Sequence, residues 1–183
     1  DLLDSIRHGL STAYSGLGRF DDSARVAREL VASLEARPVV GELRLAAARY
    51  DLGQALLYQG DLAAAQPLLD AAARVVTERL GAGSASAVMI QTTRCELLVR
   101  RDQKERALDC AVELHRVHRT SATTPRWMAW FTLANVGILQ AELRRLDEAL
   151  PSLEQALRGL IDERGPDSAR QFVSFNLAQA RWR

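Results

Sequence analysis

A small residue recurs along this chain at a nearly constant interval, and this period is the strongest constraint on its fold. The recurring positions are Ser11, Gly53, Cys95, Gly137 and Ala178, and the last interval is one position shorter than the other three. A second small residue follows twelve positions after each of the first four, at Ser23, Ala65, Ala107 and Ala149. A fixed period of this kind predicts stacked repeat units, each with two helices that approach closely where small side chains face each other. We therefore expect Gly53 and Gly137 to lie opposite Ala65 and Ala149.

Apolar residues spaced three and four positions apart predict nine helices. Glycine, proline and polar turn residues separate these helices, as in Gly60-Asp61-Leu62 and Arg144-Arg145-Leu146-Asp147. Pro67 and Pro151 are separated by twice the period, and each lies near the start of a second helix. The expected helices span 2–17, 20–36, 42–59, 62–80, 85–101, 104–119, 125–143, 146–163 and 167–182.

Composition supports an all-α chain and names no partner. The 183 residues include only 11 Gly and 5 Pro, and 48% are apolar, which favours helices around a sizeable core. The formal net charge is +1, so no uniform field favours nucleic acid or an anionic membrane. No run approaches the ~18 apolar residues that a membrane span requires. Two cysteines, Cys95 and Cys110, are too few for a disulfide framework, which predicts a reduced, cytoplasmic setting. The two could approach each other across a helical hairpin, but we expect them to be buried as small apolar residues rather than joined in a disulfide.

Two of the units carry an extended pattern that resembles tetratricopeptide repeats (TPR), in the long 42-residue form of kinesin light chains and bacterial regulatory proteins. The second unit has Leu52-Gly53, Leu56, Gly60, Ala65, Leu69 and Ala72, and the fourth has Gly137 followed by 146–157, its proline included. The resemblance implies an all-α, right-handed α-solenoid of stacked antiparallel helix pairs, with about four units and one extra helix. We expect residues 1–183 to form a single domain and to be a fragment of a longer protein.

In such arrays the first helix of each pair lines a concave groove, and the resemblance places several mixed polar and aromatic residues there. These residues are His8, Thr12, Tyr50, Asp51, Gln54, Tyr58, Thr92, Thr93, Glu96, Arg100, Phe131, Asn135, Ile138, Glu142, Phe175, Asn176 and Gln179. The preferred peptide-groove candidates are Tyr50, Gln54, Phe131, Asn135 and Asn176, which we expect to line one continuous surface. Amide side chains both donate and accept hydrogen bonds, so Asn135 and Asn176 are suited to hold a peptide main chain. The alternative is that these asparagines only bond neighbouring helices.

Two further clusters have both a structural and a functional interpretation. Aromatic residues gather in the last third of the chain, at Trp127, Trp130, Phe131, Phe172, Phe175 and Trp182, where they form either core packing or an anchor pocket. Cys110, Glu113, His115 and His118 have metal-ligand side chains, but their spacing is incomplete. We therefore predict a solvated helix end there, with no metal site.

The sequence carries no phosphate loop, nucleophile elbow or paired metal motif, so we predict no enzyme activity and no cofactor. The first hypothesis is a protein- or peptide-binding scaffold that uses the concave groove. Arginine supplies all but one of the 24 basic residues, which suggests a GC-rich bacterial genome and a regulatory protein. The alternative is a module for self-association or for docking onto a DNA-binding or kinase domain of the same chain. Both hypotheses leave room for a homo-oligomer and exclude direct nucleic-acid and membrane binding.

Overall fold

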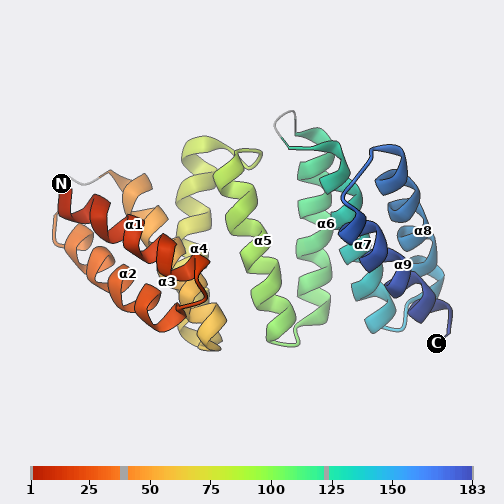
Figure 1. Cartoon of the computed structure of the whole chain (residues 1–183), viewed down its shortest axis with the longest axis horizontal. Coiled ribbons are helices and arrows are strands. Elements are labelled where there is room, and N and C mark those ends of the chain that lie inside the picture. The colour runs from red at the N-terminus through yellow and green to blue at the C-terminus, as the bar shows by residue number, and fades with distance from the viewer. Residues whose placement is uncertain (1, 38–40, 122–123, 183) are drawn as a thin grey trace. The chain divides into compact units, whose positions relative to one another are not determined.

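The computed structural model describes residues 2–37, 41–121 and 124–182. These residues form nine α-helices and no strand (Figure 1). The helices are α1 (Leu2–Gly16), α2 (Phe20–Glu35), α3 (Glu42–Gln59), α4 (Leu62–Leu80), α5 (Ala85–Arg100), α6 (Lys104–Thr120), α7 (Arg126–Glu142), α8 (Leu146–Asp162) and α9 (Asp167–Arg181). Each observed end lies within one residue of the end predicted from the sequence. The apolar spacing and the turn residues were therefore sufficient to place every helix.

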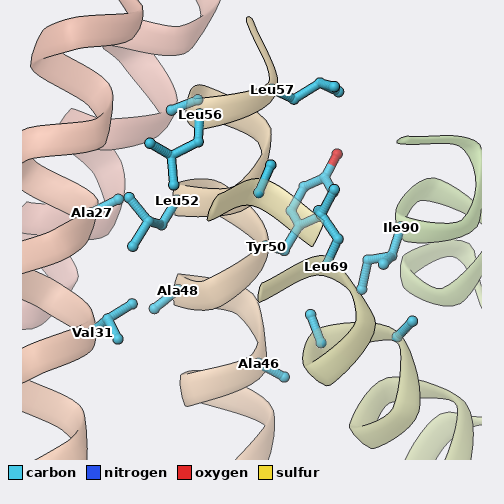
Figure 2. Close-up of a cluster of buried hydrophobic side chains, with 14 of the residues drawn as sticks. Ala27, Val31, Ala46, Ala48, Tyr50, Leu52, Leu56, Leu57, Leu69 and Ile90 are labelled. Atoms are coloured by element: carbon cyan, nitrogen blue, oxygen red, sulfur yellow. The ribbon is translucent and has the colours of Figure 1, made fainter. Parts of the chain in front are cut away.

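The chain divides into two compact units, which we call unit 1 (residues up to Leu97) and unit 2 (residues from Leu98). The core of unit 1 surrounds α3, which is buried on more than one side. Figure 2 shows Ala48 and Leu52 of α3 near Ala27 and Val31 of α2, whereas Tyr50 lies on the side of α4 and α5. A helix that is buried on several sides needs apolar residues around most of its circumference, and α3 has them.

Unit 2 has an equivalent arrangement, in which α7 packs against α6, α8 and α9. Leu153, Leu160 and Val173 are fully buried in its main core, and Trp127 and Trp130 pack against that core with partial exposure. Each unit therefore has a hydrophobic core of its own, which fixes its first helices in place.

The four tight turns that join the helices of a pair share one geometry. In each turn a backbone N–H bonds a carbonyl five residues earlier, at 2.9 Å for Arg19 to Tyr14 and for Asp61 to Leu56. The residue before that N–H has a positive φ in all four turns, and these residues are Gly18 (71°), Gly60 (90°), Asp102 (54°) and Arg144 (64°). This pattern closes a helix by bonding its last carbonyls. Unit 1 thus uses glycine for the left-handed position, and unit 2 uses residues with side chains.

Close helix contacts occur at the predicted glycines. A Cβ on Gly137 would lie 2.8 Å from Leu153 Cγ and 3.2 Å from the Ala149 carbonyl oxygen. A Cβ on Gly53 would lie 2.9 Å from Leu69 Cγ, and its nearest neighbours are Leu68 and Leu69. The predicted close contact is therefore confirmed at both glycines, with Ala149 among the nearest neighbours of Gly137 and a leucine one turn after Ala65 nearest to Gly53.

The first repeat closes the same contact with hydroxyl groups. Ser11 and Ser23 are fully buried, and the Ser23 hydroxyl donates to the Ser11 carbonyl at 2.9 Å. The two hydroxyl oxygens are 3.1 Å apart. Mutual hydrogen bonds remove the cost of burying these polar groups, so serine can replace the usual small apolar residue here.

The cysteines differ from the sequence expectation. Neither Cys95 nor Cys110 is a free thiol, and each is disulfide-bonded. The prediction of reduced thiols is therefore wrong. Two cysteines are too few for a framework of several bridges, but that count does not exclude a single disulfide.

Candidate functional site

The first helices of unit 1 line an open cavity of about 590 Å³. Six of its lining residues are among the predicted groove positions: His8, Thr12, Tyr50, Asp51, Gln54 and Tyr58. The cavity also includes residues that the sequence analysis did not assign to the groove, namely Ser11, Ser15, Gly16, Phe20, Ser23 and Met89. Helices α1 and α3 supply most of the wall, so the repeat register brings these side chains to one face.

The main charged feature of the cavity is a pair formed by His8 and Asp51. His8 Nδ1 lies 2.8 Å from Asp51 Oδ2. The Asp51 side chain is only 14% exposed, whereas that of His8 is 52% exposed. Burial raises the pKa of Asp51 to about 6, although His8 acts in the opposite direction. The carboxylate is thus held in a place where its charge is poorly solvated.

A polar network beside this pair joins three helices of unit 1. Gln54 Nε2 donates to the Tyr50 hydroxyl at 2.8 Å, and Ser15 Oγ donates to Gln54 Oε1 at 3.4 Å. The Tyr50 hydroxyl also lies 3.3 Å from Thr93 Oγ1 on α5. Tyr50 is buried, and burial raises the pKa of its hydroxyl. Tyr50 therefore serves mainly to hold the cavity wall in place. Gln54 is the more accessible of these two side chains.

Two aromatic rings form one end of the cavity. Phe20 and Tyr58 stack with their centroids 4.9 Å apart. The Tyr58 hydroxyl donates to Glu96 Oε2 at 3.1 Å, which fixes the ring. Tyr58 follows Asp51 by seven residues on α3, so the ring pair and the carboxylate lie on the same side of that helix about two turns apart.

The three groove candidates in unit 2 have different surroundings. Phe131 is partly buried and makes a tilted ring contact with Phe172, at 5.9 Å between centroids. Asn176 Nδ2 donates to the carbonyl of Phe172, one turn earlier on its own helix, at 2.8 Å. Asn135 is partly buried, and its side chain bonds no other residue in the described part of unit 2. Its amide is thus available to an incoming chain, and one donor of Asn176 is already in use.

The aromatic cluster is divided between the two interpretations. Trp127, Trp130 and Phe131 pack against the core of unit 2, whereas Phe172, Phe175 and Trp182 are 45%, 61% and 91% exposed. Trp130 lies directly over Gly159, where a Cβ would come within 2.2 Å of the indole. Core packing thus explains the rings on α7 and leaves those at the end of the chain exposed.

The histidines of α6 line a second cavity, of about 570 Å³, with Arg119, Arg126, Trp130 and Gln155 among its other residues. His118 is only 4% exposed, and neither of its ring nitrogens has a hydrogen-bond partner in the described structure. The prediction of a solvated helix end is wrong for His118, which is buried, whereas Arg119 and Thr120 after it are exposed. Burial lowers the pKa of this imidazole. Among the described residues, no three His, Cys, Asp or Glu side chains are arranged to hold a metal ion.

Comparisons with solved structures identify the fold. A single-residue variant of the TPR-like repeats from a putative kinesin light chain of Podosopora anserina matches with a TM-score of 0.79 and 16% identity, over 98% of this chain and 86% of that one. A second structure of these repeats has a TM-score of 0.77 and 18% identity, with coverage of 96% and 84%. BtubC (BKLC) from P. vanneervenii has a TM-score of 0.75 and 17% identity, over 93% of this chain and 68% of that one.

The chain therefore has the fold of TPR-like helical repeats, and both the all-α class and the resemblance to TPR solenoids are confirmed. No family model matches the sequence, and no curated protein matches it. In the described part of the chain, no helix is both long enough and apolar enough to cross a membrane.

The sequence did not reveal the pairing of His8 with Asp51. The two residues lie 43 positions apart, one more than the repeat period. They therefore occupy neighbouring first helices and are offset by one residue along the helix axis. That offset was a usable signal, because side chains one residue beyond the register can meet across adjacent helices.

Proposed function

We propose that the chain is a non-catalytic scaffold that binds a protein or peptide along its first helices. The cavity of about 590 Å³ on α1 and α3 is the observation that carries this proposal. It is open, and it combines an amide, a carboxylate and stacked rings, which suit an extended main chain with side-chain anchors. Asn135 and Asn176 extend the same role to unit 2.

The His8–Asp51 pair has two of the groups found in hydrolytic triads, but no nucleophile among the described residues completes it. No hydroxyl in the described structure bonds to the His8 ring, and the nearby Thr12 hydroxyl instead donates to the His8 carbonyl at 3.0 Å. Nucleophilic catalysis requires the hydroxyl to be within hydrogen-bond reach of the base. This arrangement supports binding rather than catalysis.

The alternative function is self-association or docking to another domain of the same protein. The exposed rings in and directly after α9 favour it, because Phe175 and Trp182 present apolar surface at 61% and 91% exposure. Clusters of exposed aromatic residues are typical of contact surfaces. Such an interface would use the exposed aromatic residues of α9, whereas the scaffold uses the cavity on α1 and α3.

A random peptide library, selected against the immobilised chain, tests the scaffold. We expect enriched peptides whose affinity falls more than tenfold in the double variant Asn135→Ala, Asn176→Ala, because each lost main-chain hydrogen bond contributes ~0.5–1.5 kcal/mol. Gln155→Ala on α8 is the matched control, because it removes an exposed amide from a second helix.

Failure to enrich any peptide would contradict the scaffold. Light scattering across a concentration series then tests the alternative, because self-association through α9 predicts a dimer that Phe175→Ser dissociates. A chain that stays monomeric at every concentration would exclude self-association. Docking to another domain of the same protein would then remain as the alternative function.

The biological setting is a further part of the proposal. A regulatory role in a bacterium rests on the arginine-rich composition and on the resemblance of the repeats. The cysteines argue against the cytoplasmic location predicted from the sequence, because both are disulfide-bonded and disulfides persist mainly in oxidising compartments. Thiol labelling of the chain, purified from its native host without reductant, distinguishes a cytoplasmic location from an oxidising compartment. Cysteines that react with the label would support the cytoplasmic location.

A further inference from the structure

We propose that the cavity in unit 1 selects a peptide with a basic side chain, whose cationic group binds Asp51. This inference rests on the proposed scaffold function and specifies the ligand chemistry of the same surface. Asp51 is the one carboxylate among the lining residues, and His8 is the one basic side chain.

The first argument is that Asp51 has unused hydrogen-bonding capacity. His8 contacts Oδ2, and no donor in the described part of unit 1 bonds to Oδ1. A carboxylate accepts several hydrogen bonds, so Oδ1 remains available to a ligand. Because the side chain is only 14% exposed, a cation that reaches it meets an anion with little water around it.

The second argument concerns competition with His8. The imidazole is 52% exposed and makes a single contact with the carboxylate, so it shields Asp51 only partly. A guanidinium is charged at all physiological pH values and donates from several N–H groups. It can therefore bond Oδ1 while His8 stays on Oδ2, or displace the imidazole altogether.

The third argument fixes the spacing of a second anchor. Phe20 and Tyr58 form the aromatic end of the cavity, and Tyr58 lies seven residues after Asp51 on α3. Seven helical residues rise about 10 Å, which equals about three residues of an extended peptide. The preferred ligand thus has a basic residue and an aromatic or apolar residue separated by two others.

Capped tetrapeptides test the charge requirement directly. Arg-Ala-Ala-Phe and the reverse sequence Phe-Ala-Ala-Arg are titrated into the whole 15N-labelled chain, and NMR shifts at Asp51 and Gln54 report binding. We expect at least one of these peptides to bind at least tenfold more tightly than its counterpart with Gln in place of Arg. A counterpart with Glu should bind more weakly still.

Two chain variants assign the effect to Asp51. Asp51→Asn should lower the affinity for the arginine peptide at least tenfold, and Asp109→Asn should change it less than twofold. Asp109 is an exposed residue of α6, so its variant makes the same change in net charge outside the cavity. His8→Ala should strengthen binding several-fold, because it removes the competing basic group.

Equal affinities for the arginine and glutamine peptides would overturn the proposal, as would full arginine binding by Asp51→Asn or weaker binding by His8→Ala. The library selection separates this result from failure of the scaffold. Enriched peptides without arginine or lysine would refute the basic anchor and leave the binding function intact, whereas an empty selection would contradict the scaffold itself.

Discussion

Units 1 and 2 differ most clearly in side-chain size at equivalent positions, which lie two repeat periods apart in the sequence. Where one unit has a small residue, the other has a large one. Ala46 and Val75 of unit 1 correspond to Trp130 and Gly159 of unit 2. Ala46 belongs to the core of unit 1 and Val75 packs against that core, whereas Trp130 covers Gly159 in unit 2. Each unit therefore fills its core with a different division of volume between the two helices. The repeat therefore constrains the summed volume of the two facing side chains more than it constrains the identity of each.

The groove positions differ in charge in the same way. Asp51 of unit 1 corresponds to Asn135 of unit 2, again two periods later in the sequence. Unit 1 has an acid with a basic neighbour, whereas unit 2 has a neutral amide at that position. A shared backbone register thus provides equivalent positions, and the residues at those positions decide what each surface binds.

The largest effect on stability is expected at the Trp130–Gly159 contact, where unit 2 has a large residue opposite a small one. Gly159→Val should destabilise the chain by ~3 kcal/mol or more, because its Cβ would overlap the Trp130 ring. Adding Trp130→Ala copies the arrangement of unit 1 and should recover stability, with a favourable coupling of ~1–3 kcal/mol. Urea unfolding followed by circular dichroism measures all three variants. Strictly additive losses would show that the two units are not packed by a common rule.

The contact within each helix pair should be equally sensitive in both units. Ala65→Leu and Ala149→Leu should each cost ~1–3 kcal/mol, because both alanines are fully buried between paired helices. Ala63→Leu, on the exposed side of α4, should change stability by no more than about 0.5 kcal/mol. Thermal unfolding provides the comparison. A loss at Ala149 without one at Ala65 would separate the two contacts, consistent with the different neighbours of Gly53 and Gly137.

Replacing Asp51 by the asparagine found at the equivalent position of unit 2 should increase the stability of the chain. The pKa of Asp51 is raised to about 6 in the folded chain from an ordinary 3.8, so its ionised form is disfavoured by folding above pH 6. Asp51→Asn should therefore stabilise the chain by about 1–2 kcal/mol at pH 7.5. The gain should disappear as the pH falls from 6 to 4, because the wild-type carboxyl then becomes protonated. Asp109→Asn is the control, and a gain that does not depend on pH would contradict this assignment.

The smallest effect concerns the tight turns. Arg144 has a φ of 64°, which costs a residue with a side chain ~1 kcal/mol, so Arg144→Gly should stabilise unit 2 by up to about that amount. Gly60→Ala should destabilise unit 1 by a similar amount, because Gly60 has a φ of 90°. Melting temperatures of both variants test the prediction. Changes of the same sign would show that the two turns are not equivalent.

The sequence predicted the helices well because periodicity, turn residues and small residues at close contacts are local features. Six residues that it assigned to the groove line the cavity of unit 1, since the register fixes which side chains share a face. It did not predict that Tyr50 is buried or that His8 meets Asp51, because these depend on how far neighbouring helices are offset. His118 was missed because its burial depends on the helix that covers it, and the pattern of α6 alone does not reveal this.

The buried imidazole of His118 gives unit 2 a response to acid opposite to that of Asp51 in unit 1. Its pKa is lowered by burial, so the unfolded chain binds a proton more readily, and stability is lost as the pH falls below 6.5. Protonation of Asp51 acts the other way between pH 6 and 4. Mild acid should therefore make unit 2 melt earlier relative to unit 1. Calorimetry should show one heat-absorption peak broaden or split as the pH is lowered, and His118→Phe should restore a single peak.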